Sequence, residues 1–220
     1  MFGVVMKLYV IPVTSFRQNC AVVACERTGL AAVVDPGGEV DKVLAEVEDL
    51  GLTVDRILLT HAHIDHVGGV REMADRLQVP IFGPHQADRE LLSQLDEQAR
   101  MFGHPPAPAF EPDHWVEDGE IVRVGEVALR VVLVPGHTPG HVAYFDPESR
   151  YALTGDLLFQ GAIGRSDFPG GDHDTLVQSI REKLFPLGDD VTFIPGHGPA
   201  SSFGEERRSN PFVGDAAIVA

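Results

Sequence analysis

The stretch Thr60-His61-Ala62-His63-Ile64-Asp65-His66 decides the fold, because it interrupts an apolar run with four metal-ligating side chains within six residues. The run before it, residues 54–60, has the pattern of a buried strand, and apolar residues repeat at helical spacing over 67–77. The histidines therefore lie at a strand-to-helix junction. Because imidazole nitrogen and carboxylate oxygen are ligands for zinc, iron and manganese, the stretch predicts a metal site.

Three later segments also place a ligand-type side chain directly after a predicted strand. His137 follows the run 127–134 in the sequence Pro-Gly-His, and Asp156 follows the run 151–154. His197 follows the run 191–194, again in Pro-Gly-His. Glycine and proline allow the backbone to turn tightly around a compact site. Each motif alone is typical of an ordinary turn, but together they indicate one shared centre.

The predicted strands fall into two clusters, and helices accompany each cluster. Strands are expected at 7–11, 20–25, 30–35, 54–60, 121–124, 127–134, 142–145, 151–154 and 191–194. Helices are expected at 40–50, from 67 to 77, at 86–102, around 176–184 and in the tail. This order predicts an α/β fold in which helices cover the outer faces of two stacked sheets, a four-layer αββα sandwich formed by one domain over residues 1–220.

Charge and hydropathy narrow the possible partners. The chain has 220 residues, 17 lysines and arginines against 33 aspartates and glutamates, and a formal net charge of −16. Nucleic acid and anionic membrane surfaces are therefore poor partners, since both require clustered positive charge. A small-molecule substrate is expected instead. The sequence carries no signal for a particular oligomeric state.

The N-terminal stretch and the cysteines indicate a cytoplasmic protein. Residues 2–13 contain Lys7 and Pro12 and lack a basic leading segment, so they predict a first strand and not a signal peptide. Cys20 and Cys25 lie five residues apart in one predicted strand. They therefore point to opposite faces and cannot pair with each other. Two unpaired, buried thiols fit a reducing compartment.

On these motifs the sequence resembles the metallo-β-lactamase superfamily, and within it the single-domain relatives of glyoxalase II, the hydroxyacylglutathione hydrolases. The resemblance implies the metallo-β-lactamase fold and two zinc ions, with iron or manganese as alternatives. It implies a first ion on His61, His63 and His137 and a second on Asp65, His66 and His197, with Asp156 bridging them. Asp65 and Asp156 would also position the hydroxide that the two ions share.

Three further residues have a functional and a purely structural interpretation. Asp35 ends a predicted strand before Pro-Gly; the resemblance makes it a hydrogen-bond partner that orients the metal loops, and the alternative is a turn-forming residue. His141 could likewise orient a ligand or pack in a strand. Arg165 is expected to contact a substrate anion or to form a salt bridge. The remaining histidines, His85, His104, His114 and His173, are expected to be exposed to solvent.

Three functions compete for this site. The favoured one is a metal-dependent hydrolase of thioesters such as S-lactoylglutathione. The alternative is a persulfide dioxygenase of the same superfamily, with one iron on His61, His137 and Asp156; such oxygenases usually carry cysteine where this chain has His141. A structural metal module is disfavoured, because structural sites are often rich in thiolates and saturate four ligands.

The segment after His197 bears on the substrate. Glyoxalase II enzymes carry an additional helical domain there, which contributes much of the contact with glutathione. Only about 23 residues follow His197 in this sequence. Broad acceptance of thioesters and weak binding of the glutathione moiety are therefore expected.

Overall fold

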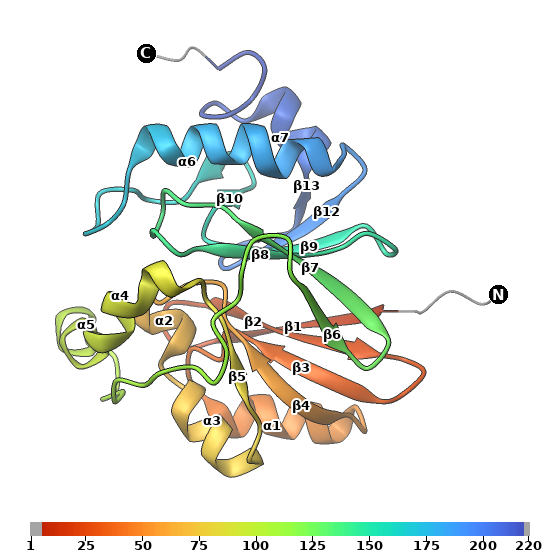
Figure 1. Cartoon of the computed structure of the whole chain (residues 1–220), viewed down its shortest axis with the longest axis vertical. Coiled ribbons are helices and arrows are strands. Elements are labelled where there is room, and N and C mark those ends of the chain that lie inside the picture. The colour runs from red at the N-terminus through yellow and green to blue at the C-terminus, as the bar shows by residue number, and fades with distance from the viewer. Residues whose placement is uncertain (1–5, 218–220) are drawn as a thin grey trace.

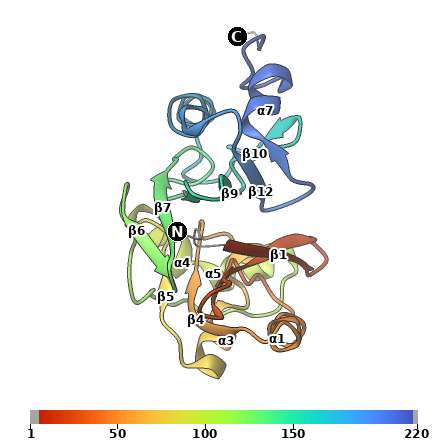
Figure 2. The ribbon, with the colours of Figure 1, turned by 90° about the vertical axis from the view of Figure 1, so that its right-hand side faces the viewer.

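Two stacked β-sheets form the centre of the molecule, and helices cover both outer faces (Figure 1). The computed structural model describes residues 6–217. Helices α1 to α5 lie against the sheet from the N-terminal half, and α6 and α7 lie against the sheet from the C-terminal half (Figures 1 and 2). The predicted αββα sandwich is confirmed.

The first sheet has the strand order β1-β2-β3-β4-β5. Its first three strands form an antiparallel meander, and β4 and β5 continue it in parallel. The bounds are β1 Met6–Val13, β2 Gln18–Cys25, β3 Leu30–Val34, β4 Thr53–Leu58 and β5 Ile81–Phe82. Because parallel strands need a crossover, α1 (Val40–Asp49) joins β3 to β4, and α2 (Ile64–Val67) and α3 (Val70–Leu77) join β4 to β5.

The second sheet has the order β13-β12-β9-β8-β7-β6. Its strands are β6 Ile121–Val124, β7 Val127–Leu133, β8 Val142–Asp146, β9 Tyr151–Gly155, β12 Thr192–Pro195 and β13 Ser201–Ser202. A separate hairpin, β10 (Leu158–Phe159) and β11 (Ala162–Ile163), follows β9. The helices are α4 Arg89–Ser93, α5 Leu95–Phe102, α6 His173–Ser179 and α7 Phe203–Ser209.

Three hydrophobic clusters hold the four layers together. One lies between the first sheet and its helices, one between the two sheets, and one between the second sheet and its helices. Tyr144 of β8 lies in the middle cluster and donates a hydrogen bond to the Leu59 carbonyl at 2.9 Å, which ties the two sheets together. Cys20 and Cys25 lie in different clusters and are free thiols, so the prediction that they face opposite ways is confirmed.

Several element boundaries differ from the predictions. The helix expected from residue 67 is split at Gly68 and Gly69, where the backbone passes close to the Pro36–Gly37 turn; the Gly69 N–H donates to the Pro36 carbonyl. The helix expected over 86–102 is divided at Gln94 into α4 and α5. A short strand, β13, pairs with β12 after the strand predicted to be the last. Tertiary contacts override the helical periodicity at these points.

The N-terminal strand begins at Met6 in the structure. Residues 2–5 of the predicted strand lie outside the described part of the chain. Within residues 6–217, no helix is both long enough and apolar enough to cross a membrane.

Candidate metal centre

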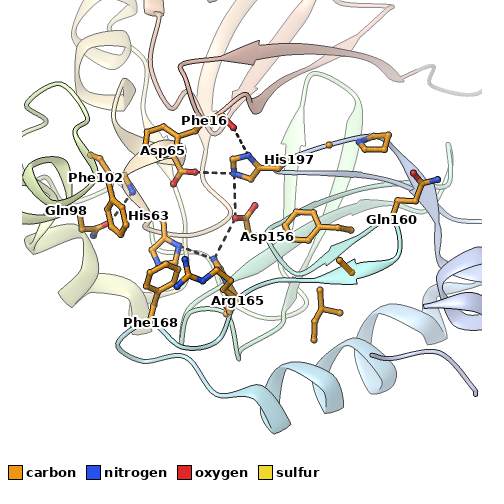
Figure 3. Close-up of a pocket in the computed structure, with 17 residues that line it drawn as sticks. Phe16, His63, Asp65, Gln98, Phe102, Asp156, Gln160, Arg165, Phe168 and His197 are labelled. Carbon is orange, nitrogen blue, oxygen red and sulfur yellow. Dashed lines mark hydrogen bonds and ion pairs between the residues drawn. The ribbon is translucent and has the colours of Figure 1, made fainter. Parts of the chain in front are cut away.

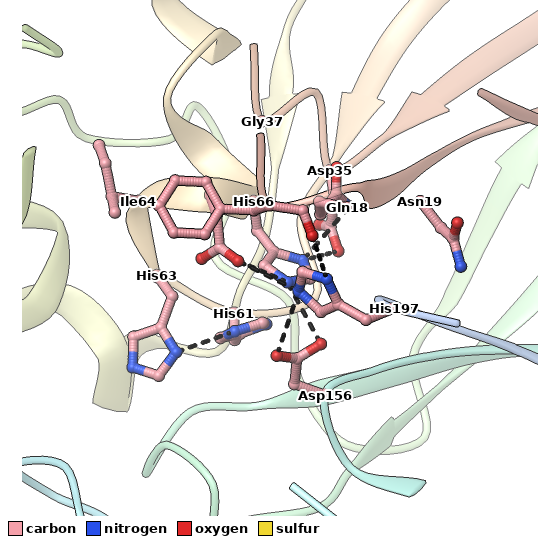
Figure 4. A network of polar contacts seen from close by, with 12 residues as sticks. Gln18, Asn19, Asp35, Gly37, His61, His63, Ile64, His66, Asp156 and His197 are labelled. Atoms are coloured by element: carbon pink, nitrogen blue, oxygen red, sulfur yellow. Dashed lines mark hydrogen bonds and ion pairs between the residues drawn. The ribbon is translucent and has the colours of Figure 1, made fainter. Parts of the chain in front are cut away.

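The ligand-type side chains meet at one edge of the two sheets, where several strands end. The His61–His66 stretch follows β4, the His137 loop follows β7, Asp156 follows β9 and His197 follows β12. Figure 4 shows His61, His66, Asp156 and His197 pointing toward one another from loops of both sheets. The sandwich therefore brings together residues as much as 136 positions apart in the chain.

The first group of nitrogen atoms comes from His61, His63 and His137. His63 Nδ1 lies 3.2 Å from His61 Nε2 and 2.9 Å from His137 Nε2. The three ligand atoms are close enough together to bind one ion. His61 and His137 are buried and His63 is half-buried, so a cation held there would be partly shielded from water.

The second group consists of Asp65, His66 and His197. His197 Nε2 lies 3.1 Å from Asp65 Oδ2, and His66 Nε2 lies 3.9 Å from the same oxygen. These atoms are also close enough together to bind one ion. The second group combines one carboxylate with two imidazoles, whereas the first has only imidazoles.

Asp156 lies between the two groups. Its Oδ1 is 3.3 Å from His66 Nε2, and its Oδ2 is 3.6 Å from His197 Nε2 and 3.9 Å from His137 Nε2. The carboxylate therefore faces the second group with both oxygens and the first group with one. Gly196 is required beside it, because a Cβ at this position would lie 2.2 Å from Asp156 Oδ1.

Backbone carbonyls orient two of the histidines. His137 Nδ1 is 2.6 Å from the Arg165 carbonyl oxygen, and His197 Nδ1 is 3.2 Å from the Phe16 carbonyl oxygen. Since a carbonyl only accepts, both Nδ1 atoms carry the hydrogen and donate. The Nε2 lone pair of each ring is then left free to face the centre of the site.

Asp35 orients one histidine of each group. Its carboxylate accepts hydrogen bonds from the Thr60 backbone N–H at 2.8 Å and the Thr60 hydroxyl at 2.6 Å. Because that hydroxyl donates to Asp35, its oxygen accepts from His61 Nδ1, 3.0 Å away. Asp35 Oδ2 is also 2.9 Å from His66 Nδ1. The Nε2 atoms of both rings therefore face inward, as the interpretation of Asp35 as an orienting residue requires.

Burial and charge shift the histidine pKa values of the two groups in opposite directions. Burial lowers the pKa of His61, His137 and His63, the last to about 3, and for His61 and His63 the neighbouring imidazoles add to the effect. Burial also opposes charge on His66 and His197, but the carboxylates of Asp156 and Asp65 outweigh it and raise both pKa values. The same charged imidazoles hold the pKa of both carboxyls below its usual range, against burial.

Two buried atoms show that the residues suit a cation. His66 Nε2 and Asp156 Oδ1 are inaccessible to solvent and lie 3.3 Å apart, in an ion-pair contact that lacks the geometry of a hydrogen bond. A divalent cation between the two groups would satisfy both atoms, and an all-nitrogen-and-oxygen donor set suits zinc, iron or manganese.

His141 contacts Asp156 through the backbone and not through the carboxylate. Its Nε2 accepts a hydrogen bond from the Asp156 N–H at 3.1 Å, and its ring stacks on His61 with centroids 4.4 Å apart. His141 is fully buried. These contacts hold one residue of each sheet in position, so a positioning role fits His141.

The side chain of Arg165 is engaged in a salt bridge. Its guanidinium donates to both oxygens of Asp167, at 2.9 and 2.8 Å, and lies over the Phe168 ring. Of the four histidines expected to be exposed, His173 is exposed, but the prediction is wrong for His85, His104 and His114, which are half-buried. His104 Nε2 lies 2.9 Å from the Gly37 carbonyl oxygen. Only the folded chain places residues 37 and 104 side by side.

Asp88 is a residue of this site that sequence reasoning missed. Its buried carboxylate accepts hydrogen bonds from the Ala62 N–H at 3.1 Å, the Thr138 hydroxyl at 2.8 Å and the Gly140 N–H at 2.5 Å. It thereby joins the loop of the first histidines to the loop of His137. Burial raises its pKa to about 6. An aspartate before a helix is common, and the sequence contains no signal that separates this one.

A pocket of about 610 Å³ opens beside both groups (Figure 3). His63, Asp65, Asp156 and His197 contribute to its wall. This volume is in the range of small-molecule sites. A substrate can therefore reach the proposed ligands from one side, while the other sides are closed by protein.

Comparison with known proteins agrees with the fold and the motifs. A family model described as the metallo-beta-lactamase superfamily matches residues 13–197. The chain therefore belongs to the metallo-beta-lactamase superfamily.

Particular relatives share most of its length. The chain is 45% identical to the hydroxyacylglutathione hydrolase GloC of Haemophilus influenzae, over 94% of this chain and 98% of that protein. Its structure is similar to that of the BLEG-1 B3 metallo-beta-lactamase, with a TM-score of 0.87, 34% identity and coverage of 94% and 99% of the two chains. It is also similar to TTHA1623 in a di-iron-bound form, with a TM-score of 0.85, 37% identity and coverage of 93% and 99%.

Replacing Asp88 tests its role as the link between the two loops. Asp88→Ala leaves two backbone N–H groups and one hydroxyl without their acceptor, so we expect the free energy of unfolding to fall by at least about 2 kcal/mol. We also expect bound metal to be lost at lower chelator concentration. The control is Asp118→Ala, which removes a single exposed hydrogen bond to Leu133. Equal effects of the two variants in denaturant titrations would contradict the role.

Proposed function

We propose that this protein is a hydrolase with two metal ions that cleaves thioesters, S-lactoylglutathione among them. The observation that carries the proposal is the pair of ligand groups with Asp156 between them, each group with its lone pairs turned inward. The relationship to a protein named hydroxyacylglutathione hydrolase supports the thioester substrate. Membership of the superfamily and the nitrogen and oxygen donors support a divalent metal.

The assignment of ligands follows the geometry. We assign His61, His63 and His137 to one ion, Asp65, His66 and His197 to the other, and Asp156 to both. Zinc is the ion we propose, with iron or manganese as alternatives. When bound, the two cations would lower the pKa of a water molecule from about 15.7 toward neutrality, polarise the thioester carbonyl and receive the thiolate.

The residues of the chain then have distinct tasks. The carboxylates of Asp65 and Asp156 face the space between the two groups, where they would accept hydrogen bonds from the attacking water and hold it in position. Asp35 keeps Nε2 of His61 and of His66 directed to the centre through its contacts with Thr60 and His66. Burial excludes bulk water, which strengthens these electrostatic contacts.

The competing activity is oxygen-dependent oxidation of a persulfide at a single iron. Elemental analysis of the purified protein, combined with assays of thioester hydrolysis and oxygen uptake, separates the two. We expect two metal ions per chain, hydrolysis of S-lactoylglutathione, and no oxygen consumption with a persulfide. One iron per chain with oxygen consumed on persulfide would overturn the hydrolase.

Asp156 and His197 provide the test of the two-ion assignment. Asp156→Asn keeps the side chain's shape but weakens the negative charge between two cations, so turnover should fall by at least about 100-fold. His197→Ala should instead release mainly one ion. Asp174→Asn, an exposed carboxylate on α6, is the matched control and should match the wild type. Two retained metals and full activity in the Asp156 variant would refute the bridging role.

The order of metal release with pH follows from the pKa directions. The imidazoles of the first group have lowered pKa values and stay neutral in mildly acidic solution, whereas His66 and His197 have raised values and take up protons first. Metal affinity falls about tenfold per pH unit for each proton that competes.

Dialysis against a chelator at stepwise lower pH should therefore release the ion of Asp65, His66 and His197 first. Metal content would fall from two ions to one before it falls to none. The His197→Ala variant should show only the later step. Release of both ions in a single step would contradict this assignment.

A further inference from the structure

The pocket beside the metal groups extends to both sides of the Asp156 carboxylate (Figure 3). On one side are Phe102 and Phe168, whose rings lie 6.0 Å apart, and Phe168 lies 5.3 Å from the ring of His63. On the other side is Phe159, 6.5 Å from the ring of His197. The first side adjoins the all-histidine group and the second side adjoins the mixed group.

The walls of both sides are mainly apolar. Ile163 accompanies Phe159 on the strands of the β10–β11 hairpin, where Gln160 is the polar lining residue. Phe16, Ile64, Ala162 and Pro199 add further apolar lining. Gln98 lines the pocket, but its side-chain oxygen accepts from the Ile64 N–H and its amide donates to the Ala62 and Leu91 carbonyls. These hydrogen bonds within the protein leave Gln98 little capacity to bind a polar substrate.

The lining offers no free positive side chain to an anionic substrate. Arg165 is the one lysine or arginine among the lining residues that the structure describes, and its Nε and Nη2 donate to the carboxylate of Asp167. A glutathione moiety carries two carboxylates, and neither would find an unpaired lysine or arginine within the pocket.

We propose that the preferred substrates are thioesters in which both the acyl group and the thiol group are uncharged and apolar, one held by Phe102 and Phe168 and the other by Phe159 and Ile163. This inference rests on the proposed thioester hydrolysis. The carbonyl would lie between the two sides, beside Asp156. Burial of apolar surface on each side would then supply binding energy that a polar tripeptide cannot use.

Four lactoyl or phenyllactoyl thioesters test the proposal with the metal-loaded full chain. Three share the lactoyl group, on ethanethiol, 2-phenylethanethiol or glutathione, and the fourth is 3-phenyllactoyl ethanethiol. We expect each added phenyl group to raise kcat/KM at least about tenfold over lactoyl ethanethiol, equivalent to about 1.4 kcal/mol. S-lactoylglutathione should not exceed lactoyl ethanethiol by more than about tenfold.

Two variants assign the sides of the pocket. Phe102→Ala should reduce the gain from one phenyl group at least about threefold and leave the other gain intact, and Phe159→Ala should do the reverse. Each gain is the ratio of the kcat/KM values of two substrates measured with the same variant. A loss of activity that affects both substrates equally therefore leaves the ratio unchanged. The control is Phe212→Ala, an exposed phenylalanine outside the pocket, which should leave both ratios unchanged.

The outcomes separate this inference from the proposed function. The inference is overturned if all four thioesters are hydrolysed but either phenyl group fails to raise kcat/KM over lactoyl ethanethiol. It is also overturned if kcat/KM for S-lactoylglutathione exceeds that for lactoyl ethanethiol by a thousandfold or more. Both results would leave the proposed hydrolase activity intact. Unchanged phenyl gains in both pocket variants would also overturn the inference. No hydrolysis of any of the four thioesters by protein carrying two metal ions overturns both.

Discussion

The buried carboxylate of Asp35 is the contact on which the site depends. It lies at the end of β3 and accepts hydrogen bonds from the backbone and hydroxyl of Thr60 and from His66. Two neighbouring parallel strands and the start of α2 are thereby held at fixed distances. Because the Thr60 hydroxyl is committed to Asp35, His61 has one orientation of its ring and one tautomer open to it. A single carboxylate thus directs one imidazole in each group.

At the edge where the two sheets meet, the charges of buried imidazoles and carboxylates must balance one another. Seven histidine and aspartate side chains are packed into a space where burial penalises charge. Asp65 and Asp156 raise the pKa of His66 and His197, while burial lowers the pKa of the other imidazoles. Divalent cations bound there would take the place of protons on these imidazoles and balance the charge of the two carboxylates. The site is therefore complementary to positive charge located between the groups.

The space next to the ligands has the opposite character. One wall presents nitrogen and oxygen atoms, and the walls on either side present phenylalanine and isoleucine. This division separates the chemistry of bond cleavage from the recognition of the substrate. It also explains how a chain with a net charge of −16 can have a pocket suited to apolar groups, since Asp65 and Asp156 are the only acidic residues among the described residues that line it.

The sequence by itself determined the sandwich, most of its strands and the side chains that meet at its edge. Those features follow from local signals: alternating or continuous apolar runs, and ligand-type residues directly after them. The tertiary structure decided what depends on distant segments. Examples are the breaks in the helices at Gly68 and Gln94, the half-burial of His104 against Gly37, and the link that Asp88 makes between two loops. The apolar pocket belongs to the same class, because its walls come from segments that no local pattern relates to one another.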